Sequence, residues 1–329
     1  MSAIGERNLV AGIDVGGTKS SIVVTDESGT VRYEHVAPTD ASALVHQLGG
    51  LVRDAQAQLG EKVVAVGVAI PGQVDPEHGS VRMAVNLGIT YLPLASLLQA
   101  ELGVPVFVEH DVRAAVVWLS GQAADESPAA PASLVFIAVG TGLSAGIVLD
   151  GVLLRGDNRL AGEVGHIVVD PDGIACPCGM RGCLETIVAG PGIARQAQEA
   201  VAAGRQTVLT AGATAGDVFR AGAAGDPVAV EIIDRVAGHL ARLIVALSLS
   251  LGIRRAVIGG GVAAAGPTLL DPIRSRLARD RAASPLVDAA IGEPDVALLS
   301  PTEAPSARGA ALIARRHVRL PEREGVGER

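Results

Sequence analysis

Short runs of apolar residues recur along the chain and predict β-strands. Most of them, such as Val63–Ile70, are apolar throughout instead of alternating with polar residues. A strand of this kind is buried on both faces, as in an α/β sheet covered by helices. The predicted strands are residues 9–14, 20–25, 31–36, 63–70, 104–108, 134–139, 144–149, 255–258 and 296–299.

Longer segments carry apolar residues at helical spacing. Leu44, Leu48, Leu51 and Leu59 recur on one face of the segment that precedes the fourth predicted strand, which is typical of an amphipathic helix. Two other segments open with a proline, a residue that is common in the first helical turn. The predicted helices are residues 40–59, 111 to about 120, 227–252, 267–283 and 306–317.

The second half of the chain repeats the start of the first half. Gly142 lies 125 residues after Gly17, and the same offset places the apolar run 21–24 on the run 146–149. A strand, a glycine turn and a strand in both halves predict a duplicated α/β fold. We expect a first lobe at residues 1–121 with a helix at about 305–318 packing back on it, a second lobe at 132–304, and a disordered tail at 319–329.

Composition narrows the possible partners. The chain has 329 residues, a net charge of -8, and only two lysines, Lys19 and Lys62. Nucleic-acid binding needs clustered basic residues, so we expect no nucleic-acid partner. The longest apolar run, residues 243–253, is too short to span a bilayer, and the first residues do not resemble a signal peptide. We therefore expect a cytoplasmic protein with no membrane contact.

All three cysteines lie in one glycine-containing loop, as Cys176, Cys178 and Cys183, with His166 ten residues upstream. Three thiolates and an imidazole form a ligand set that zinc prefers in structural sites. Three small buried hydrophobes are the alternative, and an odd cysteine count argues against disulfides. A zinc ion that fixes this loop also fixes the nearby carboxylates of Glu163 and Glu185, which can bind the hydroxyls of a polyol.

Three glycine turns, at residues 16–18, 140–142 and 259–261, each follow a predicted buried strand. Glycine lets the backbone approach a phosphate closely, and Thr18 and Thr141 add hydroxyl groups. Together the turns indicate a nucleotide held between two lobes, with tight hairpins as the alternative. Neither the dinucleotide pattern nor the P-loop pattern is present.

These motifs together resemble the ROK family of sugar kinases and related repressors. The matching segments are DVGGTK at 14–19, IPGQVD at 70–75, VGTGLSAG at 139–146, GEVGH at 162–166, CPCGMRGCLE at 176–185 and IGGGV at 258–262. The resemblance implies a two-lobed actin-like, hexokinase-like fold of the ribonuclease H-like class, with a nucleotide and sugar cleft between the lobes. It also implies transfer of the ATP γ-phosphoryl group to a sugar hydroxyl, with Mg2+ and a structural Zn2+.

The resemblance gives roles to particular residues. Asp111 matches the catalytic base, and an aspartate at a helix start stays ionised at neutral pH, although by position alone it is also a common N-cap. The implied sugar ligands are Asn86, His110, Glu163, His166 and Glu185. The implied nucleotide and Mg2+ residues are Asp14, Gly16, Gly17, Thr18, Lys19, Thr141, Gly142, Gly260 and Gly261, and the zinc ligands are His166, Cys176, Cys178 and Cys183.

The sequence departs from the family pattern beside the base. Family kinases usually read Asn-Asp-x-Asn, whereas this chain has His110, Asp111, Val112 and Arg113. An imidazole ring offers different hydrogen bonds from an amide, and an arginine adds a fixed charge. These two changes leave the sugar open, because a site that binds hydroxyl groups selects strongly among acceptors.

Several functions therefore compete. The first is phosphorylation of a hexose such as glucose, at its 6-hydroxyl. Alternatives are a kinase of an N-acyl hexosamine or a sugar-like cyclitol, polyphosphate as the phosphoryl donor, and a sugar-binding protein without catalysis. A DNA-binding repressor is not expected, because only eight residues precede Leu9 and a helix-turn-helix needs more. The resemblance also implies a homodimer or homotetramer.

Overall fold

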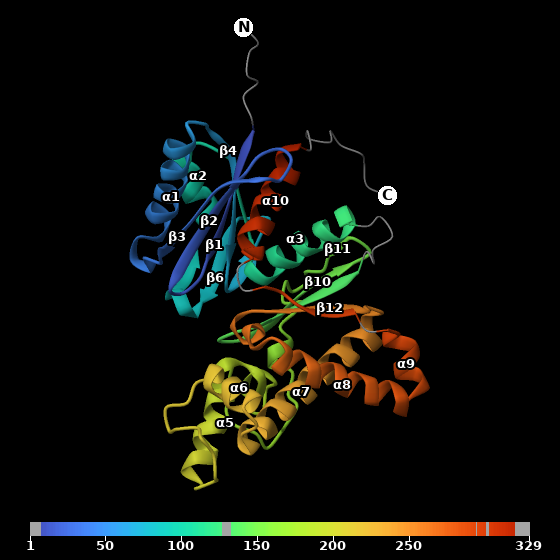
Figure 1. Cartoon of the computed structure of the whole chain (residues 1–329). Helices are drawn as coiled ribbons and strands as arrows, with labels where there is room; N and C mark the ends of the chain where they lie inside the picture. The colour runs from blue at the N-terminus through green and yellow to red at the C-terminus, as the bar shows by residue number, and fades with distance from the viewer. Residues whose placement is uncertain (1–7, 127–132, 294, 301–302, 320–329) are drawn as a thin grey trace. The chain divides into compact units, whose positions relative to one another are not determined.

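The computed structural model describes residues 8–126, 133–293, 295–300 and 303–319. The chain forms two compact units (Figure 1). The first unit contains the residues up to Glu126, the short segment Gly156–Leu160, and the residues from Ala304 onward. The second unit contains Ser127–Arg155 and Ala161–Glu303.

The first unit is built on a five-stranded sheet with the strand order β3-β2-β1-β4-β8. The strands are β1 (Leu9–Val15), β2 (Lys19–Thr25), β3 (Val31–Pro38), β4 (Val63–Ile70) and β8 (Val106–His110). β1, β2 and β3 pair antiparallel, whereas β1, β4 and β8 pair parallel. Because the parallel strands end at one edge of the sheet, Asp14 and His110 lie near that edge.

Helices and a small second sheet complete this unit. The helices are α1 (Leu44–Leu59), α2 (Leu94–Leu102), α3 (Asp111–Glu126) and α10 (Pro305–Arg319), with the short turns η1 (Ala41–Ala43) and η2 (Val85–Leu87). The three-stranded sheet has the order β5 (Gln73–Asp75), β6 (Ser80–Ala84) and β7 (Ile89–Leu92).

Helix α10, from the far end of the sequence, packs against β1, β4 and α3 in Figure 1. Glycines permit the close approach. A Cβ atom on Gly12 or on Gly67 would lie 2.0 Å from a carbonyl oxygen of α10, and one on Gly309 would lie 1.8 Å from the Ala114 carbonyl oxygen. Small residues on α10, including Ala307 and Ala311, are fully buried against the sheet.

The second unit repeats the topology of the first sheet, with the strand order β11-β10-β9-β12-β13. The strands are β9 (Leu134–Val139), β10 (Leu143–Leu149), β11 (Val152–Leu153), β12 (Arg255–Gly259) and β13 (Asp295–Leu298). As in the first unit, two antiparallel pairs are followed by two parallel pairs. The duplication predicted from the sequence is confirmed.

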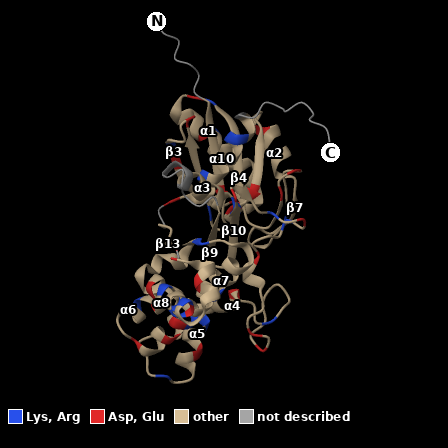
Figure 2. Cartoon of the chain, turned by 90° about the vertical axis from the view of Figure 1, so that its right-hand side faces the viewer, with Lys and Arg blue, Asp and Glu red and all other residues tan. Residues whose placement is uncertain are grey.

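Helices pack against this second sheet. They are α4 (Glu185–Val188), α5 (Gly190–Ala202), α6 (Ala215–Ala223), α7 (Pro227–Leu251), α8 (Pro267–Ala283) and α9 (Pro285–Ile291), with the turns η3 (Val164–His166) and η4 (Gly261–Ala265). In Figure 2, acidic and basic segments are interspersed along the helices of this unit, and ion pairs such as Arg281 with Asp288 and Arg276 with Asp234 join them.

The apolar run 243–253 forms the end of α7, as the predicted helix 227–252 required, and continues into the loop that precedes β12. Only one face of it is buried, at Leu243, Ile244 and Ser248, whereas Leu249 is 47% exposed. Gly252 ends the helix in the left-handed conformation, with φ 72°. No helix in the described part of the chain is long and apolar enough to cross a membrane.

Two predicted boundaries were wrong. The helix expected at residues 111 to about 120 continues to Glu126 as α3, and residues 127–132 lie outside the described part. The strand expected at 104–108 begins at Val106 instead, because Pro105 has no N–H to donate and only its carbonyl joins β4, accepting from Val66. The final helix extends to Arg319, and the predicted tail beyond it also lies outside the described part.

Candidate functional site

The loop that carries the cysteines is a tight double turn held by backbone contacts. Val168 pairs with Cys183, and Ala175 pairs with Arg181, as isolated antiparallel bridges. Gly182 has φ +67°, and a Cβ atom there would lie 1.5 Å from the Asp170 carbonyl oxygen. Glycine is therefore required at this position, and it brings the two halves of the loop together.

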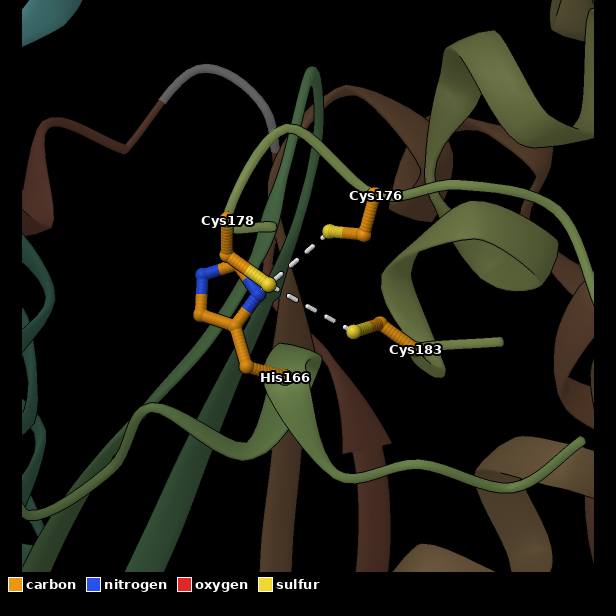
Figure 3. A group of neighbouring side chains, drawn as sticks. All are labelled: His166, Cys176, Cys178 and Cys183. Atoms are coloured by element: carbon orange, nitrogen blue, oxygen red, sulfur yellow. Dashed lines mark hydrogen bonds between the residues drawn. The ribbon is translucent and has the colours of Figure 1, made fainter. Parts of the chain in front are cut away.

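The four predicted zinc ligands converge (Figure 3). The distance from Cys176 Sγ to His166 Nδ1 is 3.7 Å, that from Cys178 Sγ to Cys183 Sγ is 3.6 Å, and ligand atoms of all four residues lie within 4.8 Å of one another. Tetrahedral zinc with Zn–S bonds of about 2.3 Å places its sulfur ligands about 3.8 Å apart. The set therefore fits a structural zinc ion. Burial raises the pKa of Cys183 to about 12, so the charge of a metal ion is needed to keep this thiolate ionised near neutral pH.

Glu163 lies at the entrance to this loop and is held by the backbone that precedes it. Gly162 has φ +99°, and a Cβ atom there would lie 1.9 Å from the Ala145 carbonyl oxygen. The Gly162 carbonyl accepts hydrogen bonds from the N–H groups of Ala145 and Val164. These contacts fix Glu163 beside β10, three residues before His166.

Glu185 lies at the other end of the loop and begins α4. Its Oε2 atom accepts a hydrogen bond of 2.8 Å from the Leu143 N–H. A Cβ atom on Gly142 would lie 2.8 Å from the same oxygen. The carboxylate that was predicted to bind sugar is therefore joined to the second glycine turn, and its other oxygen accepts no hydrogen bond from the described residues.

In the first unit, the carboxylates of Asp14 and Asp111 lie near enough to interact electrostatically. Asp14 is in β1, and Asp111 begins α3. Burial, and after it the charge of Asp111, raise the pKa of Asp14 to about 7. The Asp111 side chain is 31% exposed, so only Asp14 is poorly solvated. Two neighbouring carboxylates that repel each other are suited to share a divalent cation, whose charge would offset the repulsion.

The two oxygens of Asp111 have different surroundings. Oδ1 accepts a hydrogen bond of 2.7 Å from the Val112 N–H, and it lies 3.1 Å from His110 Nδ1. Among the residues that the structure describes, none donates a hydrogen bond to Oδ2. This oxygen is therefore available to accept a proton from a bound molecule.

Arg113 is a buried structural residue. Its guanidinium group is 3.6 Å from the carboxylate of Glu109, which is also fully buried, and it donates a hydrogen bond to the Arg159 carbonyl. Arg159 in turn pairs with Asp75 and Glu77. The charge of Arg113, one of the two departures from the family pattern, is thus directed into the protein.

The first glycine turn joins β1 to β2. The Gly16 N–H donates to the Lys19 carbonyl, and the Thr39 hydroxyl donates to the Gly16 carbonyl. Thr18 and Lys19 are exposed at the tip of the turn. A Cβ atom on Gly17 would lie 3.2 Å from the carbonyl oxygen of Asn86, so the structure brings this turn and the predicted sugar ligand Asn86 together.

A cavity of about 620 Å³ lies in the second unit, beside the second and third glycine turns. Thr141 and Gly261 line it, as the sequence suggested, whereas Gly142 and Gly260 do not. Gly260 instead lets the chain turn, because its φ is +84° and a Cβ atom would lie 2.4 Å from the Val139 carbonyl oxygen. A flat apolar base fits a cavity with this lining better than a sugar does.

Other residues that line this cavity were missed. They are Val262, Ala264, Ala265 and Thr268, which follow the third glycine turn, then Gly190 and Pro191, and finally Ala215, Gly216, Phe219, Arg220 and Ala223. One signal was present in the sequence: the Gly-Pro-Gly run at 190–192 opens α5, and a helix start next to a glycine turn is a common feature of phosphate sites. The residues between Ala215 and Ala223 lie on α6, which the sequence analysis did not predict.

The predicted site residues therefore form one group in each unit. The first unit holds Asp14, Gly16, Gly17, Thr18, Lys19, Asn86, His110 and Asp111. The second unit holds Thr141, Gly142, Glu163, His166, Cys176, Cys178, Cys183, Glu185, Gly260 and Gly261.

Comparison with known families decides the identity of this arrangement. The ROK family model matches residues 10–317, almost the whole chain. The chain belongs to the ROK family. A glucokinase from Halalkalibacterium halodurans is 35% identical over 282 residues, which cover 80% of this chain and 83% of that protein. An N-acetylmannosamine kinase from Escherichia coli is 36% identical over 258 residues, which cover 76% and 82%. This ROK protein is accordingly a homologue of sugar kinases over most of its length.

Solved structures agree with this assignment. The ROK family glucokinase from Streptomyces griseus, in complex with glucose and AMPPNP, has a TM-score of 0.75 and 30% identity, and the match covers 94% of this chain and 100% of that one. The ROK hexokinase from Thermus thermophilus has a TM-score of 0.74 and 28% identity, with 94% and 99% covered. The predicted actin-like, hexokinase-like fold class is confirmed.

Proposed function

We propose that this ROK protein is a kinase that transfers the γ-phosphoryl group of ATP to a hydroxyl of a neutral hexose such as glucose, at the 6-position, with Asp111 as the general base. The observation that carries the proposal is the geometry of Asp111. The residue begins α3, neighbours Asp14, and has one carboxylate oxygen free of hydrogen bonds from the described residues.

In phosphoryl transfer the protein mainly positions the reactants and stabilises charge, and it forms no covalent bond itself. The sugar hydroxyl oxygen forms a bond to the γ-phosphorus, and the bond between that phosphorus and the bridging oxygen of ADP breaks. The hydroxyl proton passes to Oδ2 of Asp111. Asp111 begins α3, so its carboxylate lies at the positive end of the helix dipole, where it can act as the proton acceptor.

Each unit would hold a different part of the substrates. In the first unit, Gly16, Gly17, Thr18 and Lys19 would bind phosphate oxygens, and Asp14 would hold Mg2+, which neutralises the charge of the transferred group. In the second unit, the cavity beside Thr141 and Gly261 would accept the adenine base. The proposed sugar ligands are Asn86, His110, Glu163, His166 and Glu185.

One other class of acceptor is supported by a specific observation. The relatives with similar identity include both a glucokinase and an N-acetylmannosamine kinase, so an N-acyl hexosamine is the second candidate. Glucose and N-acetylmannosamine differ at ring position 2, in both the substituent and its configuration, and a site built for a hydroxyl or an amide rejects the other by a large factor.

A coupled assay of ADP release tests the reaction. Glucose, mannose, N-acetylmannosamine, N-acetylglucosamine and inositol would be compared as acceptors with ATP and magnesium, and polyphosphate would replace ATP in a parallel series. We expect the highest kcat/KM with a hexose and ATP. ADP release that no acceptor stimulates would refute the kinase assignment.

The role of Asp111 has its own test. Asp111→Asn keeps the shape of the side chain and removes its basicity, so we expect kcat to fall by at least about 100-fold while ATP binding, measured by calorimetry, changes little. Asp54→Asn, an exposed carboxylate on α1, is the matched control. An Asp111→Asn variant with full activity would exclude Asp111 as the base.

A further inference from the structure

His110 precedes the proposed general base, Asp111, and its position suggests a separate role. His110 is the last residue of β8 and is only 9% exposed. Its Nδ1 atom lies 3.1 Å from Oδ1 of Asp111. The sequence analysis assigned His110 to the sugar, but this nitrogen lies within contact distance of the catalytic carboxylate, although its N–H is not aligned for a hydrogen bond.

Buried side-chain contacts fix the backbone around His110. Its N–H donates a hydrogen bond of 2.9 Å to Glu109, and Glu109 is paired with Arg113 in the first turn of α3. Both of these side chains are almost fully buried. The two residues that bracket His110 and Asp111 therefore fix the junction between strand and helix.

A carboxylate can rotate about its last bond and exchange its two oxygens. In Asp111, the Val112 N–H and His110 Nδ1 both approach the same oxygen, Oδ1. This one-sided contact makes the two oxygens unequal. The Nδ1 contact has the distance of a hydrogen bond without its alignment, and catalytic contacts that are poorly aligned in the free protein commonly tighten when substrate binds.

On the basis of the proposed kinase function, we propose that His110 is a positioning residue that donates its Nδ1 proton to Oδ1 of Asp111 and so presents Oδ2 to the acceptor hydroxyl. With the proton on Nδ1, Nε2 carries the lone pair. Only this second nitrogen is then left for the sugar, and it accepts a hydrogen bond without donating one.

Two substitutions separate this role from a general structural one. The amide nitrogen of asparagine can take the place of imidazole Nδ1, whereas that of glutamine takes the place of Nε2. His110→Asn therefore keeps the donor beside Asp111, and His110→Gln moves it away. We expect the kcat of His110→Gln to lie about 30- to 100-fold below that of His110→Asn, because misplacing a catalytic group by about 1 Å costs on that order.

The measurements are kcat and the KM for ATP and for the best acceptor, together with melting temperatures. The KM for ATP should be unchanged in both variants. A His110→Gln variant that keeps kcat would overturn the proposal, and so would equal losses of kcat in both variants. Should either variant fail to fold, His110→Ala supplies the second measurement, because its kcat should fall as in His110→Gln. Absence of transfer by the unsubstituted protein would instead refute the kinase function itself.

Discussion

At the scale of single residues, the most consequential feature is the pair of carboxylates at the end of β1 and the start of α3. Asp14 has a pKa of about 7 instead of 3.8 because it is buried and lies beside Asp111. Between these two values the folded protein binds a proton that the unfolded chain has released. Stability from this group is therefore complete below about pH 4 and is lost as the pH rises toward 7.

This linkage predicts how stability responds to pH. Without magnesium, the free energy of unfolding should fall between about pH 5 and pH 7 by roughly 1.4 kcal/mol per pH unit from this group. Asp14→Asn removes the titrating carboxyl and should abolish that part of the slope. Urea denaturation at several pH values would measure both proteins.

Asp54→Asn, on the exposed face of α1, serves as the control and should leave the slope unchanged. An Asp14→Asn protein with the same pH slope as the unsubstituted one would show that the pKa of Asp14 is not raised. Added magnesium should reduce the slope in the unsubstituted protein alone, because a bound cation favours the ionised carboxylate.

Residue types and spacings were enough to predict part of the site. The cysteines and His166 stand out because no other cysteine exists in the chain. The contact of Arg113 with Arg159 was not predictable, because the two residues are 46 positions apart. The Arg159 carbonyl accepts a hydrogen bond from Arg113, and Arg159 has φ +60°, a conformation that the local sequence does not predict.

At the scale of elements, the loop that carries His166 and the three cysteines connects the predicted zinc ligands to a carboxylate of the proposed sugar site. Cys183 is fully buried, and Glu185 follows it by two residues at the start of α4. Movement of the loop would therefore move Glu185 relative to Leu143, whose backbone N–H donates a hydrogen bond to the Glu185 carboxylate.

Replacing Cys183 with serine tests this connection. We expect the unsubstituted protein to carry about one zinc ion per chain, and Cys183→Ser to lose most of it. The melting temperature should fall by at least about 5 °C, which corresponds to about 2 kcal/mol in a protein of this size. The KM for the acceptor should rise more than the KM for ATP.

Met180→Ala is a suitable control, because Met180 lies in the same loop with its side chain 55% exposed. Metal analysis, thermal denaturation and kinetics would be performed on all three proteins. A zinc-free protein with the original melting temperature would mean that the cysteine cluster does not stabilise the loop.

Long buried elements were predicted well, and short or half-exposed elements were not. The strands β4 and β9 and the helix α8 have the predicted bounds, because their apolar runs and terminal prolines are unambiguous. The β5-β6-β7 sheet was missed, since its strands are three to five residues long and partly exposed. Helices α5 and α6 were missed because alanine and glycine dominate them, which leaves few large apolar residues to reveal the period.

At the scale of the whole molecule, the last helix completes the first unit. α10 lies across β1 and β4 and beside α3 (Figure 1), and Gly309 allows it to approach the Ala114 carbonyl. A sequence pattern could predict this helix. The short distance between α10 and its neighbours depends on three glycines in three different elements, Gly12, Gly67 and Gly309.

Gly309→Ala should therefore be destabilising, although alanine favours helices. The added Cβ atom would meet a carbonyl oxygen at 1.8 Å, so the two helices must move apart. We expect the free energy of unfolding to fall by about 1–3 kcal/mol, as for other overpacked cores, as measured by urea denaturation.

Gly121→Ala, in the partner helix α3, is the matched control. Its Cβ atom would meet only the end of the Leu312 side chain, at 3.3 Å. That side chain can adjust, so the change should be within about 0.5 kcal/mol or slightly stabilising. Equal losses in both variants would mean that the close approach of α10 is not what limits substitution at Gly309.

The position of α10 also bears on how the protein is made. The ribosome releases this helix long after β1 and β4 have emerged. Until then the nascent first sheet keeps one apolar face uncovered, at Val10, Val23 and Ala65. A stalled or prematurely terminated polypeptide would expose this face for longer, and such incomplete products should depend on chaperones to avoid aggregation.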